Sequence, residues 1–306
     1  MLPLFLTPAI LSRVFLMPDI DKQAYQTDRK ITRKHFEKAA DTYDAAAILQ
    51  QEVARRMIER LDYIKIQPEV SLDLGCGTGQ VTEALLKKYP KSKVIALDLA
   101  ANMVAKARKK GSWFRKPMGV CADVNQLPIK NNTVDLLISS LMLQWCDDLP
   151  TVFNEMANVM KVGGLVLFTT FGPDTLKELR QSWSEVDDLP HSNNYSDMHD
   201  IGDQLMQAGF SQPVMDMEMI TMTYSSVKYL MRDLKQIGAT NTAKGRRKTL
   251  TGKQRIKAFE NAYEQFKQSD GLYPATYEVI YGHAWMPDLA VQKPAGVETY
   301  IPIKSV

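Results

Sequence analysis

The stretch VSLDLGCGTGQ, Val70 to Gln80, places three glycines within five residues directly after a short apolar run. Glycine costs backbone entropy in such a run, so the spacing indicates that a ligand comes very close to the main chain. A phosphate-binding loop would need G-x-x-x-x-G-K-[ST], and no lysine follows here. A dinucleotide loop would have G-x-G-x-x-G, whereas the spacing here is G-x-G-x-G.

Acidic residues around the loop favour another nucleoside ligand. Asp73 precedes the first glycine, where it would repel a pyrophosphate but suits a cationic amino group. Asp98 ends the second predicted strand, where a carboxylate can accept hydrogen bonds from both ribose hydroxyls. Asp123 ends the third strand, within reach of an adenine amino group. S-adenosylmethionine combines adenosine with an ammonium and fits this set. The competing interpretation is that each acid merely caps the helix after it.

Strand and helix patterns alternate along the chain, which predicts a mostly parallel sheet covered on both faces. The predicted strands are VSLDLG, KVIALDLA, PMGVCADV, VDLLISSLML, GLVLFTTFG, PVMDMEMITMTY and ATYEVIYGHAW. Residues 28–64 read as helix, with helical spacing of apolar residues and no glycine or proline. We therefore expect an α/β, Rossmann-like fold with seven strands, and a helical cap insertion at 225–274 before the last strand.

Three regions are expected along the chain. Residues 1–33 form an N-terminal arm that is partly disordered, residues 34–285 the main domain, and residues 286–306 a tail. The apolar start, MLPLFLTPAILSRVFLM, lacks the features of a signal peptide or a spanning helix. Either translation begins at Met17 or these residues form a short amphipathic arm, and no membrane association is expected.

The net charge and the cysteine content limit the classes of function that this chain can have. The formal net charge of +3 does not by itself indicate a nucleic-acid partner. The three cysteines, Cys76, Cys121 and Cys146, show neither metal-ligand nor C-x-x-C spacing. No metal site is expected, and a reducing cytoplasm fits best.

From Phe36 to Gly172 the chain resembles the class I S-adenosylmethionine-dependent methyltransferases, on the motif LDLGCGTG with Asp98 and Asp123. From Lys34 to Trp285 it resembles the malonyl-[acyl-carrier protein] O-methyltransferases of biotin synthesis. The segments that carry this resemblance are HFEKAADTYDAAAILQQEVARRM, FGPDTLKEL, YSDMHDIGDQLMQAGFSQPVMDME, YLMRDLKQIGATN, GRRKTLTGK and YPATYEVIYGHAW.

The resemblance implies methylation of the free carboxylate of a malonyl thioester, which masks the charge so that the chain can be extended toward pimeloyl. S-adenosylhomocysteine would be the other product. Malonyl-acyl carrier protein and malonyl-coenzyme A both remain open as substrate. Two alternatives also remain: a methyltransferase for a small molecule such as a quinone precursor, and an assembly factor. A complex I assembly factor thought to hydroxylate an arginine shares the DMHD and RDL features.

A carboxylate is already ionised at neutral pH, so the reaction needs positioning rather than a strong base. Arg232 and Arg180 are candidates to hold the substrate carboxylate, since a guanidinium can bind it through two hydrogen bonds. His199 is expected to be a packing residue at a helix start. The predicted cofactor-binding residues are Tyr43, Asp73, Gly75, Cys76, Gly77, Asp98, Leu99, Met103, Asp123, Val124 and Ser139. Phe36, Gln50, Ser140 and Gln144 are expected nearby.

The segment KGRRKTLTGKQRIK, Lys244 to Lys257, holds seven basic residues and no acid. It lies in the cap insertion, and acyl carrier proteins are strongly acidic, so Arg246, Arg247 and Lys248 are predicted to dock the carrier. The alternative interpretation is that this segment is an ordinary solvent-exposed surface with no binding role. Nucleic acid is not the expected partner, because no aromatic residue interleaves the segment.

Overall fold

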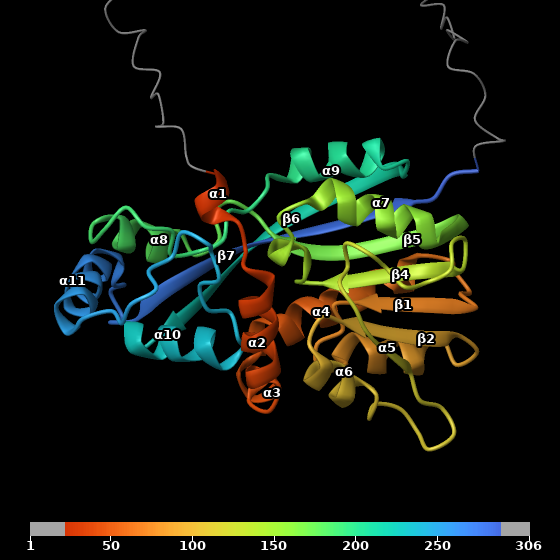
Figure 1. The fold of residues 1–306 in the computed structure, drawn as a ribbon, viewed down its shortest axis with the longest axis horizontal. Helices are drawn as coiled ribbons and strands as arrows, with labels where there is room; N and C mark the ends of the chain where they lie inside the picture. The colour runs from red at the N-terminus through yellow and green to blue at the C-terminus, as the bar shows by residue number, and fades with distance from the viewer. Residues whose placement is uncertain (1–21, 289–306) are drawn as a thin grey trace, which may run out of the picture.

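The computed structural model describes residues 22–288, so the expectations for residues 1–21 and 289–306 lie outside the described part. Its centre is one seven-stranded sheet with the order β3-β2-β1-β4-β5-β7-β6 (Figure 1). Strands β1 to β5 are parallel, and β7 runs antiparallel to both β5 and β6. The expected Rossmann-like sheet is confirmed. The bounds are β1 Val70–Leu74, β2 Lys93–Asp98, β3 Met118–Cys121, β4 Val134–Ser140, β5 Met160–Phe171, β6 Ser211–Tyr224 and β7 Tyr273–Trp285.

Helices cover both faces of the sheet. Leu136 and Ile138 of β4 pack toward α4 and α5, whereas Leu137 packs with α7 and α9 on the other face. All three leucine and isoleucine side chains are fully buried, as expected for a central parallel strand. The helices of the sheet are α4 Ile48–Arg60, α5 Gln80–Lys88, α6 Ala101–Ala107, α7 Leu149–Val159 and α9 Met198–Gln207.

The prediction of one uninterrupted helical region over residues 28–64 was wrong, because the structure divides this region into several shorter helices. The region forms α2 Arg29–Ala39, α3 Tyr43–Ala46, α4, and a 3-10 turn, η1 Leu61–Tyr63. The Thr42 hydroxyl donates to the carbonyl of Gln236 (2.9 Å), and Thr78 donates to the Asp44 carboxylate (2.5 Å). These contacts with distant segments compensate for the lost helical hydrogen bonds, although no glycine or proline marks the breaks.

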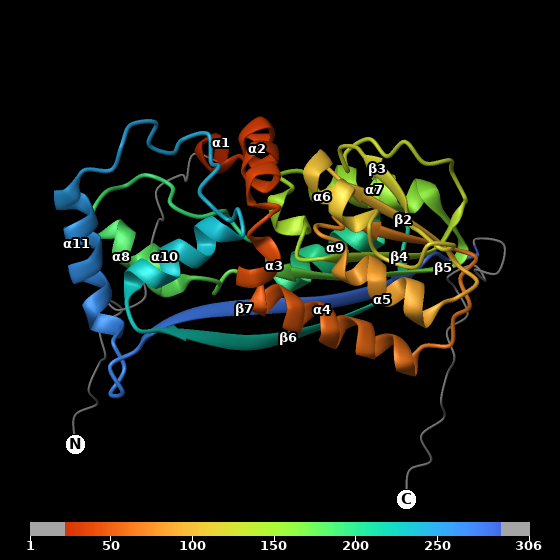
Figure 2. The same cartoon turned by 90° about the horizontal axis from the view of Figure 1, so that it is seen from below.

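A cap lies beyond the carboxyl ends of the parallel strands. It consists of α8 Lys177–Ser184, α10 Val227–Gln236 and α11 Lys253–Tyr263, followed by η3 Glu264–Phe266. In both Figure 1 and Figure 2, α2 and α3 lie between these cap helices and the helices α5 and α6. The expected insertion between β6 and β7 is therefore helical, and α8 joins it from a different part of the chain.

The N-terminal segment is tied to the cap. Beyond α1 Lys22–Tyr25, Thr27 forms an antiparallel bridge with Ala243. The N–H groups of Lys244 and Gly245 donate to the carbonyls of Gln26 (2.7 Å) and Ala24 (2.8 Å). We therefore propose that the domain includes residue 24 onward, rather than beginning at residue 34.

Candidate functional site

The glycine loop joins β1 to α5 in a conformation that glycine alone adopts readily. Gly75, Gly77 and Gly79 have φ values of +77°, +52° and +91°. The N–H groups of Gly75 and Cys76 both donate to the carbonyl of Leu97 (2.8 and 2.9 Å), which fixes the loop against β2. A Cβ on Gly75 would lie 2.3 Å from Cγ and 2.6 Å from Cβ of Met142. The loop is therefore packed so closely at Gly75 that a side chain does not fit there.

A cavity of about 100 Å³ opens at the loop, at the carboxyl ends of β1, β2, β3 and β4. This is where the strand order reverses, the usual ligand position in open α/β sheets. Of the predicted cofactor residues, it brings together Tyr43, Gly75, Gly77, Asp98, Leu99, Met103, Asp123 and Val124. We call it the cofactor cavity. Its remaining lining residues are Arg29, Thr32, Phe36, Asn125, Ser140, Leu141, Met142, Trp145 and Cys146.

Asp98 is held in place by the main chain. Its two carboxylate oxygens accept hydrogen bonds from the N–H groups of Gly77 (2.9 Å) and Ala100 (2.8 Å). Each oxygen retains a second lone pair, so the carboxylate can still accept two hydroxyl groups. Burial raises the pKa of Asp98, and the backbone donors oppose that shift. The position suits the predicted recognition of a ribose.

Asp123 lies just beyond the end of β3, and it has a partner that the sequence did not indicate. Arg29, the first residue of α2, donates through Nη1 to Oδ2 of Asp123 (2.8 Å). The N–H of Asn125 donates to Oδ1 (3.0 Å). The predicted contact of Asp123 with an adenine amino group therefore has to share the carboxylate with Arg29. Their ion pair joins the N-terminal helix to the sheet across one end of the cavity.

Three predicted cofactor residues lie behind the cavity lining rather than in it. The Asp73 carboxylate is buried and accepts the Thr82 hydroxyl of α5 (2.5 Å), and burial raises its pKa to about 7. Ser139 is buried and donates to the carbonyl of Leu74 (2.9 Å), and the cavity is lined by Ser140 instead. Cys76 is also buried, and burial raises the pKa of its thiol, which disfavours a nucleophilic role. In this geometry these residues support the loop and sheet.

Tyr43 and Phe36 line both the cofactor cavity and a second cavity beside it. Phe36 packs edge-to-face on Trp145, with ring centroids 5.1 Å apart. Leu141 and Trp145 also line both cavities. These four residues form a shared wall, so groups bound in the two cavities would meet there.

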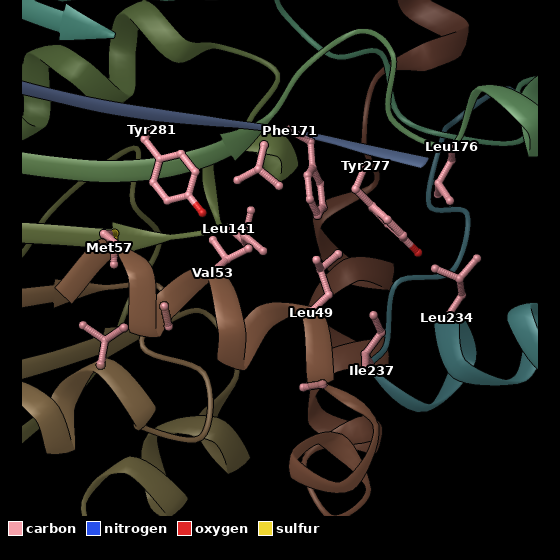
Figure 3. Packing of buried hydrophobic residues seen from close by; sticks show 14 of the residues in the cluster. Leu49, Val53, Met57, Leu141, Phe171, Leu176, Leu234, Ile237, Tyr277 and Tyr281 are labelled. Atoms are coloured by element: carbon pink, nitrogen blue, oxygen red, sulfur yellow. The ribbon is translucent and has the colours of Figure 1, made fainter. Parts of the chain in front are cut away.

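The second cavity, about 410 Å³, lies between the sheet edge and the cap, and we call it the chamber. Its apolar side includes residues from β5, α8, α10 and β7. Figure 3 shows Phe171 and Tyr277 beside Leu49 of α4, with Leu234 of α10 and Ile237, directly after α10, approaching from the cap. The apolar and aromatic lining comprises Leu141, Phe171, Leu176, Leu179, Trp183, Tyr195, Met231, Leu234, Ile237, Ala239 and Tyr277 with Phe36, Tyr43 and Trp145.

The polar side of the chamber includes cap loops and helix α2, with Arg246 and Arg247 among its residues. Gln50 and Gln144, expected near the cofactor, line the chamber and not the cofactor cavity. The Nδ1 atom of His35 lies 2.6 Å from the Thr240 hydroxyl. Among its lining residues, all within the described part, there are two arginines and no aspartate or glutamate.

Neither arginine predicted to hold the substrate carboxylate lines the chamber. Arg180 turns back on its own helix and donates to the backbone carbonyls of Thr175 (2.5 Å) and Pro173. Arg232 is exposed and lies over the Tyr229 ring, with its Cζ 5.0 Å from the centroid. The sequence places both near the active site but does not show which way helices α8 and α10 turn. His199 lies at the start of α9 but is exposed, so its predicted packing role was wrong; its Nδ1 lies 2.8 Å from Oδ1 of Asp197, and it lines neither cavity.

Comparison with known proteins agrees with this geometry. Residues 72–168 match a family model described as "Methyltransferase domain". A malonyl-[acyl-carrier protein] O-methyltransferase of Gallionella capsiferriformans is 50% identical over 266 residues, covering 85% of this chain and 91% of that protein. One of Halorhodospira halophila is 45% identical over 263 residues, covering 86% and 89%.

Solved structures support the fold. BH2331 from Bacillus halodurans C-125, described as a methyltransferase, has a TM-score of 0.54 at 19% identity and covers 76% of this chain and 99% of that one. The Haemonchus contortus phosphoethanolamine N-methyltransferase 2 in complex with S-adenosyl-L-methionine has a TM-score of 0.50 at 17% identity, covering 82% and 57%. At these identities the likeness shows the fold alone.

Proposed function

The chain belongs to the malonyl-[acyl-carrier protein] O-methyltransferase family, and we propose that it methylates the free carboxylate of a malonyl thioester in biotin synthesis. The observation that carries this proposal is the pair of cavities with a shared wall. One is built around the glycine loop and Asp98, and the other combines apolar walls with two arginines and no carboxylate. Such a chamber favours an anionic substrate with an apolar stem.

S-adenosylmethionine supplies the methyl group as a sulfonium, so a carboxylate oxygen forms the new O–CH₃ bond while the S–CH₃ electron pair returns to sulfur. Gly75, Gly77, Asp98 and Met103 would hold the cofactor in its cavity. The products are a neutral methyl ester and S-adenosylhomocysteine. The carboxylate needs no deprotonation near neutral pH, so the protein has to position it and remove its water.

The chamber lining is suited to both tasks. Aromatic residues such as Phe171, Trp183 and Tyr277 exclude water around the acyl group. Burial, followed by the charge of Arg246, lowers the pKa of His35, so this imidazole stays neutral near pH 7. It therefore adds no competing charge beside the arginines.

The decisive experiment offers purified protein labelled S-adenosylmethionine with malonyl-acyl carrier protein, malonyl-coenzyme A and unloaded carrier in parallel. We expect label only on the malonyl thioesters, as a base-labile ester, and the ratio of the two rates identifies the carrier. If no label appears although the cofactor binds, the small-molecule or assembly-factor alternative replaces this proposal.

We also propose that the exposed part of the basic segment docks the carrier protein. Arg247 and Lys248 are exposed and, within residues 22–288, have no carboxylate partner, whereas Arg255 is paired with Asp187 (2.9 Å). Arg247 lies at the chamber, so an acidic carrier bound there would deliver its acyl arm into it. Complementary charge of this kind increases the association rate of a complex.

Reversing both charges, Arg247→Glu with Lys248→Glu, should lower kcat/KM for malonyl-acyl carrier protein about 10-fold at low salt. Cofactor affinity should not change. The matched control is Lys65→Glu with Lys91→Glu, which changes the net charge equally at exposed positions that precede β1 and β2, away from the carboxyl ends of the strands where the cap lies. Equal effects of the two double variants would show a general charge effect and contradict the docking role.

The described residues contain no helix that combines the length and apolar character needed to cross a bilayer. Cys76, Cys121 and Cys146 are free thiols. The thiols agree with the reducing, cytoplasmic location that we propose for this enzyme.

A further inference from the structure

The chamber has a positive charge that its own lining does not neutralise. Arg246 and Arg247 line it, and none of its lining residues is an aspartate or glutamate. A guanidinium that a bound ligand shields from water is unfavourable there without a partner of opposite charge. This arrangement therefore indicates that the partner is the ligand, and that the ligand is an anion.

The two arginines differ in burial and anchoring. Arg247 is exposed, whereas Arg246 is half-buried and donates through Nη1 to the carbonyl of Ala243 (2.9 Å). The backbone on either side of Ala243 is fixed to the N-terminal segment through the Thr27 bridge and the Gly245 N–H. Arg246 is thus oriented in advance, and its Nη2 and Nε donors can still bind both oxygens of a carboxylate.

Arg246 lines the chamber together with His35 and Phe36 of α2. Phe36 also lines the cofactor cavity, so the part of the chamber beside α2 adjoins that cavity. A carboxylate bound by Arg246 would thus lie near the shared wall. Arg180 and Arg232 offer no such position, because neither lines the chamber.

We propose that Arg246 is the residue that binds the free carboxylate of the malonyl thioester and orients it toward the cofactor cavity. This inference rests on the proposed function. It makes Arg246 a specificity-determining residue, since an uncharged acyl thioester such as acetyl would leave its guanidinium unpaired. Methylation removes the substrate's charge, so the product loses its ion pair and is released more readily.

The test compares wild type with Arg246→Gln and Arg246→Lys, using malonyl-acyl carrier protein and malonyl-N-acetylcysteamine, a short thioester without carrier. Loss of a charge-assisted pair should raise KM about 10- to 100-fold for Arg246→Gln on both substrates. Arg246→Lys should recover part of that loss. The affinity for S-adenosylhomocysteine should remain within about twofold in both variants. Lys228→Gln, at an exposed position of α10, serves as the charge-loss control.

A second readout separates carboxylate binding from a structural role. Wild type should be inhibited by a malonyl thioester much more strongly than by the matching acetyl thioester, when both compete with malonyl-acyl carrier protein. Arg246→Gln should lose this preference. If Arg246→Gln impairs only the carrier-bound substrate, Arg246 docks the carrier and the inference is wrong. It is also wrong if Arg232→Gln raises KM while Arg246→Gln does not. If wild type methylates no malonyl thioester, the proposed function itself has failed.

Discussion

Replacing Gly75 by alanine is expected to destabilise the fold by about 2–5 kcal/mol and to abolish measurable cofactor binding. Two effects combine in this number. A non-glycine residue at φ +77° costs about 1–2 kcal/mol. The added methyl group would also overlap Met142, and overpacking of this kind costs about 1–3 kcal/mol.

The clash is not easily relieved, because it involves Cβ of Met142 as well as Cγ, at 2.6 and 2.3 Å. Rotation about χ1 moves Cγ but leaves Cβ where it is. The loop or the chain after β4 must therefore shift, and both line the cofactor cavity. Denaturant unfolding and calorimetric titration with S-adenosylhomocysteine measure the two consequences.

Gly163→Ala is the matched control. Gly163 has almost the same φ, +75°, but an added Cβ there would meet nothing within 4 Å. The Gly163→Ala substitution should lower the free energy of unfolding only by the cost of a positive φ, about 1–2 kcal/mol. It should leave cofactor affinity unchanged. If Gly75→Ala is no more harmful than Gly163→Ala, close packing of the loop is not what requires glycine at residue 75.

Local sequence patterns were sufficient to predict the sheet and one side of the cofactor cavity. Each parallel strand is a short apolar run, and residues that directly follow such runs, such as Gly75 and Asp98, meet at one edge of the sheet. Their proximity follows from the topology alone. This is why Gly75, Gly77, Asp98, Leu99, Asp123 and Val124 line one cavity, which Tyr43 and Met103 reach from α3 and α6.

Contacts between distant segments could not be predicted in this way. Arg29 and Asp123 are 94 residues apart in the chain, and no local pattern around Arg29 distinguishes it from the other basic residues of α2. The run of charges from Lys244 to Lys257 likewise does not show that Arg246 turns inward while Arg247 and Lys248 remain exposed. That difference depends on the pairing of residues 243–245 with the N-terminal segment.

Asp73 shows why a motif position does not define a contact. The sequence suggested that its carboxylate meets the ammonium of the cofactor, since it lies two residues before the first glycine of the loop. In the fold, β1 directs it toward α5, where Thr82 donates to it, and it is 1% exposed. Strand alternation decides this direction, and a shift of one residue would reverse it.

Replacing Asp98 by asparagine is expected to weaken binding of S-adenosylhomocysteine about 100-fold with little change in fold. The carboxylate of Asp98 accepts backbone N–H groups from Gly77 and Ala100, one on each oxygen. Asparagine keeps one acceptor oxygen, but its NH₂ group faces the other N–H donor. One backbone hydrogen bond is lost, and so is one acceptor for a ribose hydroxyl. Each charge-assisted hydrogen bond is worth about 1.5–3 kcal/mol, which makes a 100-fold loss reasonable.

Asp123→Asn provides the comparison that makes this prediction specific to Asp98. The side chain of Asp123 is 37% exposed and ion-paired with Arg29, so water can replace part of what the substitution removes. We expect about a 10-fold loss of affinity at most. Titration calorimetry with both variants, at matched thermal stability, measures the difference. If Asp98→Asn binds within twofold of wild type, the Asp98 carboxylate does not recognise the ribose. A larger loss for Asp123→Asn would instead make the carboxylate shared with Arg29 the main anchor of the adenosine.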